Sequence, residues 1–402
     1  MINIATIKTG VKGLVSVSGS ISSGKRSWQG NQMAPEIMVA MFLSGTKTLE
    51  KKVLNDVLEN AAINISFSID NDYIRFSTVV ARGHEKLFLD IITDILINST
   101  FPSDEYEIIV GRFRAMVMES STDPSDVAYR ALTRAWFPLG TVQYKQNAKE
   151  MIQLLDTLTR EEVLSAYNIL VGHTSINIAI AGDVDKTLWQ REVKTSFSKL
   201  PKKTHKSVPA LATLSPSGGE NINIKDKTSV SAFWAIPINI DVKSRRYLAL
   251  VVLLRILGGD FVSRLMSEVR EKRGLTYHIS SGVQGVSCGD TGLLYIVADF
   301  APVLHEKGVK ATEEVLGNLF AKGIKPGELD RVRQAIAGEY EVRLATSSGM
   351  ALELLNCLML GRPLEYIDEY PKLIKSVTMK EVKEVLNSIK DSKFYRVSAG
   401  SI

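Results

Sequence analysis

Two hydrogen-bond donors of different kinds lie seven residues apart in the second half of the chain, Arg270 and Tyr277. Arg270 offers five N–H donors on a planar guanidinium that keeps its charge at every ordinary pH. Tyr277 offers a phenolic hydroxyl on a rigid ring. Side chains of these types can act on one bound group only if the elements that carry them face the same cleft.

The residues before Arg270 predict an amphipathic helix. Asp260 can cap its start, because a carboxylate accepts the free amide hydrogens of a first helical turn. Gly274 can end it, because glycine adopts the left-handed conformation of a helix end at little cost. One apolar face has members at helical spacing, namely Phe261, Leu265 and Val269. Arg270 is therefore expected in the last helical turn.

A strand is predicted directly after Gly274. Tyr277, Ile279 and Ser281 alternate there with His278 and Ser280, as residues on the two faces of a strand do. Arg270 at the end of the helix and Tyr277 at the start of the strand can then face the same cleft. Two simpler interpretations stay open: a solvated cation at a helix end for Arg270, and a half-buried sheet aromatic for Tyr277.

The segment from Leu257 to Ser281 resembles the C-terminal-domain signature of the pitrilysin/insulinase family of zinc peptidases. In that family, an Arg and a Tyr at this spacing bind the carbonyl groups of a peptide and stabilise the oxyanion. The resemblance thus implies these roles for Arg270 and Tyr277. It also implies that the other half of the site, an inverted zinc motif His-x-x-Glu-His, comes from a homologous domain.

That zinc motif is missing from this sequence. No two of its five histidines lie within one helical turn: His84, His173, His205, His278 and His305. In the family the motif precedes a Gly-Thr pair, which Gly45-Thr46 resembles here. Counting back from this pair puts Glu36 and Ala40 at the ligand positions and Val39 at the position of the general base. Zinc needs about three protein ligands, so we expect no metal and no other cofactor in this chain.

Other positions of the family pattern also lack ligands. The same count in the second half of the chain reaches Leu253, Ile256 and Leu257, which predict a packed helix. A further family carboxylate is expected on the helix before Asp123-Pro124, where this sequence has Met116 and, nearest to it, the acid Glu119. The resemblance therefore implies a subunit that carries one half of a catalytic site.

Composition is that of an ordinary globular protein. The chain of 402 residues is 45% hydrophobic and carries a net charge of only +5, with no basic run interleaved with aromatics, which argues against nucleic-acid binding. Its two cysteines, Cys288 and Cys357, are too few for a disulfide framework. Residues 1–8 lack the pattern of a secretory signal, and no apolar run reaches the roughly 18 residues of a membrane span. We expect a cytoplasmic protein without a membrane segment.

The two halves of the chain repeat each other at an offset near 220 residues. Recurring marks include His84-Glu85-Lys86 with His305-Glu306-Lys307, and the helix starts at Thr159 and Thr378, each followed three residues later by a glutamate. The order of predicted elements favours an α+β class with two homologous domains, each an antiparallel sheet covered by helices. We predict domains at 1–200 and 221–402, joined by a linker at 201–220 that contains Pro201, Pro209 and Pro216.

Together these observations favour the non-metal-binding subunit of a heterodimeric zinc endopeptidase. The expected partner is a homologous subunit that carries His-x-x-Glu-His and zinc, which would activate water and polarise the scissile carbonyl. Arg270 and Tyr277 would hold carbonyl groups of an unfolded peptide substrate, and the isolated chain would be inactive. Two alternatives stay open: a catalytically inactive structural or assembly subunit, and a peptide-binding homodimer of the same fold.

Overall fold

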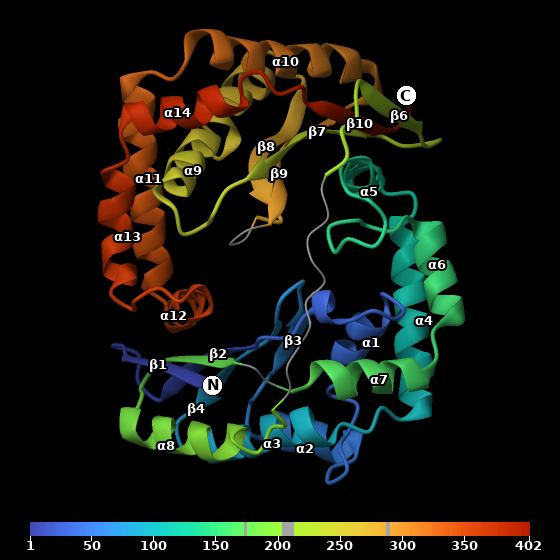
Figure 1. Ribbon diagram of the computed structural model, residues 1–402, viewed down its shortest axis with the longest axis vertical. Coiled ribbons are helices and arrows are strands. Elements are labelled where there is room, and N and C mark those ends of the chain that lie inside the picture. Colours follow the sequence, from blue (N-terminus) through green and yellow to red (C-terminus); the bar gives the residue numbers. More distant parts are fainter. Residues whose placement is uncertain (173–174, 203–212, 287–289) are drawn as a thin grey trace. The chain divides into compact units, whose positions relative to one another are not determined.

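The computed structural model describes residues 1–172, 175–202, 213–286 and 290–402 (Figure 1). Its strands form two five-stranded sheets, and helices cover both sheets. The predicted α+β class is therefore confirmed. Within the described ranges, no helix is long and apolar enough to cross a membrane.

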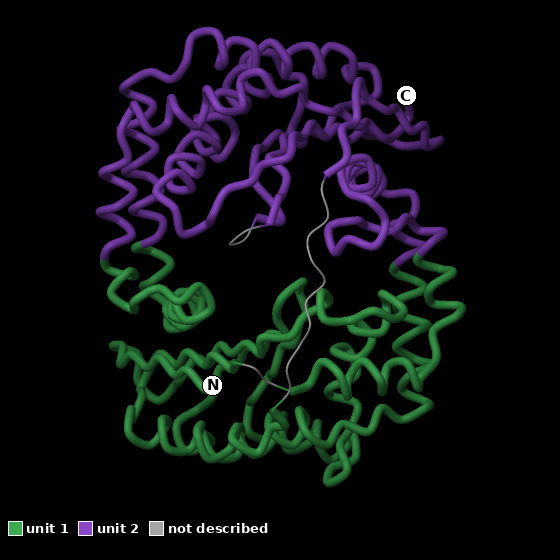
Figure 2. Tube along the Cα trace, viewed as in Figure 1, with its two compact units in different colours: residues 1–116, 151–208, 341–368 green, residues 117–150, 209–340, 369–402 purple. Residues whose placement is uncertain are grey.

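The chain divides into two compact units, neither of them continuous in sequence (Figure 2). Unit 1 comprises residues 1–116, 151–208 and 341–368, and unit 2 comprises residues 117–150, 209–340 and 369–402. Most of the predicted linker, residues 203–212, lies outside the described residues. The predicted domain boundaries at 200 and 221, which follow from the repeat in the sequence, thus stay a prediction.

The sheet of unit 1 has the strand order β1-β5-β2-β4-β3. β1 runs parallel to β5, and the other neighbouring pairs are antiparallel. Buried and less buried residues alternate along β4, whereas every residue of β5 is buried. The strands are β1 (Ile2–Lys8), β2 (Leu14–Ile21), β3 (Ser66–Ile69), β4 (Ile74–Ala81) and β5 (Ile176–Gly182).

The sheet of unit 2 has the corresponding order, β6-β10-β7-β9-β8. Here β6 runs parallel to β10, and the remaining pairs are antiparallel. Both sheets therefore have the same topology, as the predicted duplication requires. The strands are β6 (Gly219–Asn223), β7 (Val230–Asn239), β8 (Thr276–Gln284), β9 (Thr291–Phe300) and β10 (Tyr395–Gly400).

The helices also follow the repeat. Each predicted capping box is present: the threonine hydroxyl accepts the amide of the third helical residue, whose glutamate accepts the threonine amide. Unit 1 holds all or most of η1 (Lys25–Ser27), α1 (Ala34–Ala40), α2 (Lys51–Asn60), α3 (Glu85–Asn98), α4 (Ser103–Ser120), α6 (Ala148–Thr157), α7 (Arg160–Leu170), α8 (Lys186–Phe197) and α12 (Ser347–Leu360). Unit 2 holds all or most of α5 (Pro124–Trp136), α9 (Arg245–Gly258), η2 (Met266–Glu271), η3 (Pro302–Leu304), α10 (His305–Lys322), α11 (Pro326–Leu344), α13 (Tyr366–Lys375) and α14 (Met379–Ile389).

The last strand of each half ends in the same backbone conformation. Gly182 and Gly400 have φ of 138° and 143°, values that side chains of L-residues rarely adopt. A Cβ atom at either position would lie 2.3 Å or 2.4 Å from a carbonyl oxygen, Leu14 O or Ser229 O. Glycine is therefore required at both sites, and each half accordingly ends its last strand in Ala-Gly, at Ala181-Gly182 and Ala399-Gly400.

Each half of the sequence contributes one helix to the sheet of the other half. α5, from the first half, packs on β7 and β10, where Leu132 and Trp136 join Phe233 and Val397 in one apolar cluster. α12, from the second half, packs on β5 and β2, with Leu354 and Leu355 beside Ala5 and Ala179. This exchange explains why both units are discontinuous in sequence.

Limited proteolysis is expected to cut first between Leu200 and Ser229, because the proline-containing segment 201–220 suits an extended linker. Two fragments of similar size should appear on a denaturing gel. They should still elute together in native size-exclusion chromatography, since α5 and α12 each pack on the sheet of the other fragment. Early cuts elsewhere, or fragments that separate without denaturant, would contradict this expectation.

Candidate functional site

The segment that carries Arg270 and Tyr277 starts where α9 ends. After Gly258 the chain turns, and it becomes helical again only at Arg264, with a π-helix, η2, from Met266 to Glu271. The predicted helix cap at Asp260 is therefore wrong. Its carboxylate accepts the amide of Val262 within the turn at 3.1 Å and binds two guanidinium groups, those of Arg255 at 3.3 Å and Arg331 at 2.9 Å.

Phe261 does not belong to the apolar face on which the sequence placed it. Leu265 and Val269 are fully buried, but the Phe261 side chain is 70% exposed, because the turn interrupts the helical spacing. Its ring lies instead 5.5 Å from the guanidinium carbon of Arg270, a cation–π arrangement. Phe261 therefore contributes to the site and not to the core.

Arg270 lies in the last turn of η2, as predicted. The basic side chains that follow it are paired on the surface, Lys272 with Glu268 at 2.6 Å and Arg273 with Glu314 at 2.7 Å. Among the described residues, Arg270 forms no ion pair and no side-chain hydrogen bond, so its N–H donors are available to a ligand. Gly274, with φ of 63°, ends the helix in the left-handed conformation that the sequence predicted.

Tyr277 is 92% exposed, so the interpretation as a half-buried sheet aromatic is wrong. The strand predicted after Gly274 is β8, but its pairing with β9 shifts between Thr276 and His278. Tyr277 is the extra residue of this β-bulge and therefore does not share the buried face of Ile279. No hydrogen bond joins its hydroxyl to another described residue.

Both predicted residues line one open pocket of unit 2. The pocket has a volume of about 350 Å³ and is lined by Phe261, Arg270, Glu271, Gly274, Thr276 and Tyr277. Arg270 and Tyr277 can donate hydrogen bonds there, and the carboxylate of Glu271 can accept one. A peptide backbone offers C=O and N–H groups in alternation, so this set suits an extended peptide.

Four members of the pocket were not identified from the sequence as site residues: Gly274, which was identified only as a helix end, and Phe261, Glu271 and Thr276. Phe261 followed an apolar helical spacing, which favoured a core position. Glu271 lies in a run of charged residues, where nothing separates a site carboxylate from a solvated one. Thr276 could have been identified from the sequence, because it directly precedes the candidate residue Tyr277 on the predicted strand.

The residues at the family's metal positions do not fit zinc. Glu36 forms an ion pair with Lys25, Val39 is buried, and Ala40 has no donor atom. Across the described ranges, no group of three or more His, Cys, Asp or Glu side chains could hold a metal ion. Two of the five histidines, His173 and His205, lie outside those ranges, as does Cys288.

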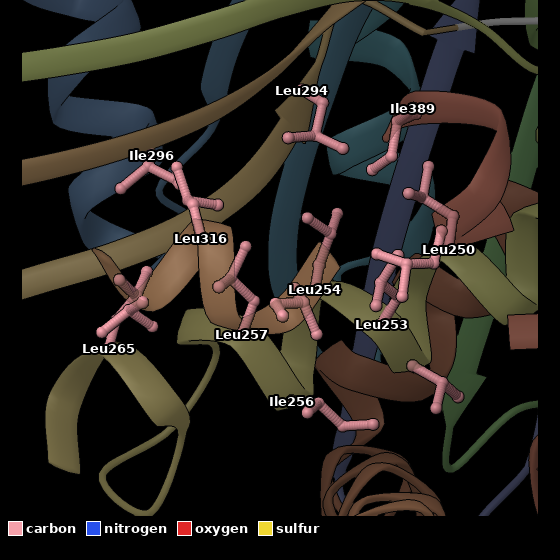
Figure 3. Packing of buried hydrophobic residues seen from close by; sticks show 14 of the residues in the cluster. Leu250, Leu253, Leu254, Ile256, Leu257, Leu265, Leu294, Ile296, Leu316 and Ile389 are labelled. Carbon is pink, nitrogen blue, oxygen red and sulfur yellow. The ribbon is translucent and has the colours of Figure 1, made fainter. Parts of the chain in front are cut away.

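The corresponding positions in the second half belong to the core of unit 2, as predicted. Leu253, Ile256 and Leu257 are at most 3% exposed and pack in one cluster with residues of β9, α10 and α14 (Figure 3). Cys357 is likewise buried, and burial raises the pKa of its thiol to about 11, so it is an inert structural residue.

Comparison with known proteins matches both halves of the chain to one family of peptidases. Residues 35–146 match the family described as "Insulinase (Peptidase family M16)", and residues 157–336 match the family described as "Peptidase M16 inactive domain". A protein of Helicobacter pylori named "Non-peptidase homolog YmxG" is 22% identical, over 89% of this chain and 82% of its own length. An uncharacterized zinc protease of Streptomyces coelicolor is also 22% identical, over 86% of this chain and 78% of its own length.

Solved structures show the same fold. The M16 inactive domain of Pseudomonas fluorescens superposes with a TM-score of 0.85 at 22% identity, covering 99% of this chain and 95% of the other. A protease of Helicobacter pylori superposes with a TM-score of 0.82 at 16% identity, with coverage of 99% and 96%. The chain therefore belongs to the insulinase family of peptidases, family M16, as the segment around Arg270 and Tyr277 had indicated.

Proposed function

We propose that this chain is the non-metal-binding subunit of a heterodimeric zinc endopeptidase. Arg270 and Tyr277 bind carbonyl groups of an unfolded peptide and stabilise the oxyanion that forms during hydrolysis. A homologous subunit with the motif His-x-x-Glu-His supplies the metal centre. The cytoplasmic location expected from the sequence is part of the same proposal.

The observation that carries this proposal is the state of the two donors. A structural arginine is usually paired and a structural tyrosine is usually buried, but Arg270 is unpaired among the described residues and Tyr277 is 92% exposed. Exposing a large aromatic side chain and leaving a guanidinium without a carboxylate contributes little to folding stability. Both features are expected of groups that await a ligand in the pocket that they share.

The structural or assembly subunit remains the second candidate, because the lack of a fitting ligand set at Glu36, Val39 and Ala40 is expected of it as well. The description of the matched family as an inactive domain agrees with either role. The two candidates differ in what Arg270 and Tyr277 do. Only the peptidase subunit requires these side chains for turnover.

Metal analysis separates this proposal from an autonomous enzyme. The chain purified alone, without chelators, is expected to contain much less than one zinc per molecule and to cleave no quenched-fluorescence peptide. A complex captured from its own cells through a tag on this chain should contain a homologous subunit, about one zinc per pair, and peptidase activity. One zinc per isolated chain, with activity that a chelator removes, would disprove the half-site proposal.

A further inference from the structure

The bulge that presents Tyr277 lies at the start of β8, which is the edge strand of the second sheet. Thr276 pairs with Phe300 and His278 pairs with Asp299, so Tyr277 has no partner residue on β9. An extra residue on one strand turns its side chain away from the regular alternation. The exposure and direction of Tyr277 therefore depend on whatever maintains this bulge.

The Thr276 hydroxyl connects the residues on both sides of Tyr277. It accepts a hydrogen bond from the His278 amide at 3.1 Å. It also lies within donating distance of two carbonyl oxygens, His278 O at 2.8 Å and Asp299 O at 2.5 Å. Thr276 is only 6% exposed, so these bonds form largely away from competing water.

The His278 side chain adds a second connection to β9. Its Nδ1 lies 3.1 Å from Oδ2 of Asp299, the residue directly opposite it. The other carboxylate oxygen of Asp299 accepts a hydrogen bond at 2.5 Å from the hydroxyl of Ser231, which lies opposite Asp299 on β7. Thr276, His278, Asp299 and Ser231, which we call the bulge network, thus join three neighbouring strands at the position of Tyr277.

We propose that the bulge network positions Tyr277 for substrate, with Thr276, His278 and Asp299 as positioning residues. The proposal rests on the function proposed above for Tyr277, but the network itself does not depend on that function. A tyrosine on a regular edge strand would follow the sheet alternation. The network instead holds the ring out beside Arg270 before any ligand arrives, which reduces the ordering required on binding.

The strength of the bulge network is expected to depend on pH, because two of its members titrate. The hydrogen bond with Asp299, reinforced by its charge, raises the pKa of His278 despite partial burial, and Asp299 is the charged group that acts on it among the described residues. Burial works to raise the pKa of Asp299, but the hydrogen bonds from His278 and Ser231 outweigh it and keep that pKa below its ordinary value.

The direction of each pKa shift determines how the stability of the bulge network changes with pH. The contribution of His278 to stability is complete below its ordinary pKa near 6.5 and is lost as pH rises through its raised pKa. The contribution of Asp299 is complete above its ordinary pKa near 3.9 and is lost as pH falls through its lowered pKa. A neutral imidazole still donates one hydrogen bond, so at high pH the network weakens but does not disappear.

Nuclear magnetic resonance of the full chain labelled at histidine and tyrosine tests the network without any activity assay. Comparison with His278→Gln and Tyr277→Phe assigns the two resonances. His278 is expected to titrate above pH 6.5, and the Tyr277 resonance should shift with the same midpoint. In Asp299→Asn, the His278 midpoint should fall and Tyr277 should stop responding. A Tyr277 resonance that ignores both His278 titration and Asp299→Asn would overturn the proposal.

Kinetics of the captured complex test the positioning role. Thr276→Val removes the hydroxyl but keeps the branched shape, and it should lower kcat by roughly 10-fold with little change in KM, because small misplacements of a catalytic group are costly. Thr276→Ser, which keeps the hydroxyl, should recover most of this loss. Thr291→Val on β9 is the control, since its hydroxyl has no hydrogen-bond partner among the described residues.

The two measurements distinguish the possible failures. A captured complex that cleaves no peptide in any form refutes the proposed function, while the resonance experiment still decides whether the network holds Tyr277. An active complex in which Thr276→Val changes neither kcat nor the Tyr277 resonance refutes the positioning role. In that case the bulge would only protect the sheet edge from pairing with other chains.

Discussion

Replacing Tyr277 with phenylalanine is expected to lower kcat of the captured two-chain complex roughly 10²-fold, with a much smaller change in KM. The substitution removes one hydroxyl and keeps the ring, so the loss reports a hydrogen bond made mainly in the transition state. The melting temperature of the chain should not change, because Tyr277 is 92% exposed. Steady-state cleavage of a quenched peptide at matched zinc content measures the effect.

Tyr395→Phe is the matched control for this experiment. Tyr395 lies on β10 of the same sheet, its hydroxyl has no hydrogen-bond partner among the described residues, and it does not line the pocket. Tyr395→Phe removes the same hydroxyl group as Tyr277→Phe but leaves every donor of the pocket in place, so its complex should keep normal turnover. Equal activity of the Tyr277→Phe complex and the unaltered complex would favour the structural or assembly subunit.

The repeat could be predicted from the sequence because its marks are local. A capping box needs only Thr378 and Glu381, three residues apart, and both form the predicted bonds. The exchange of α5 and α12 between the halves could not be predicted in the same way. It depends on which apolar face meets which sheet across more than a hundred residues, and helical periodicity shows that a face is apolar but not what covers it.

The site was predictable in part for the same reason. The spacing of Arg270, Gly274 and Tyr277 correctly predicted Arg270 in the last helical turn and Tyr277 at the start of the strand, because the helix ends at a glycine with φ of 63° and the strand follows at once. The assignment of Phe261 was wrong because the turn before Arg264 breaks the helical spacing. The bulge at Tyr277 also escaped prediction, since it is specified by bonds from Thr276 to residues on two strands.

Arg270→Lys is expected to lower kcat/KM of the captured complex by about 10-fold to 10²-fold, although it keeps the positive charge. An ammonium cannot place two parallel N–H donors on one carbonyl group, and it stacks less well over the Phe261 ring, which lies 5.5 Å from the guanidinium carbon. Arg273→Lys is the matched control. Arg273 is near the end of the same helix and pairs with Glu314 at the surface, where the substitution should have little effect.

The double variant Arg270→Lys/Tyr277→Phe shows whether the two residues act as one site. Both side chains line the same pocket, so they are expected to hold one peptide segment together. Once one donor is lost, the peptide is less well placed, and removal of the second should cost less than it does in the unaltered complex. The loss in kcat/KM should therefore be smaller than the product of the two single losses. A loss equal to that product would mean that the residues act independently, with Arg270 and Tyr277 bound to separate parts of the substrate.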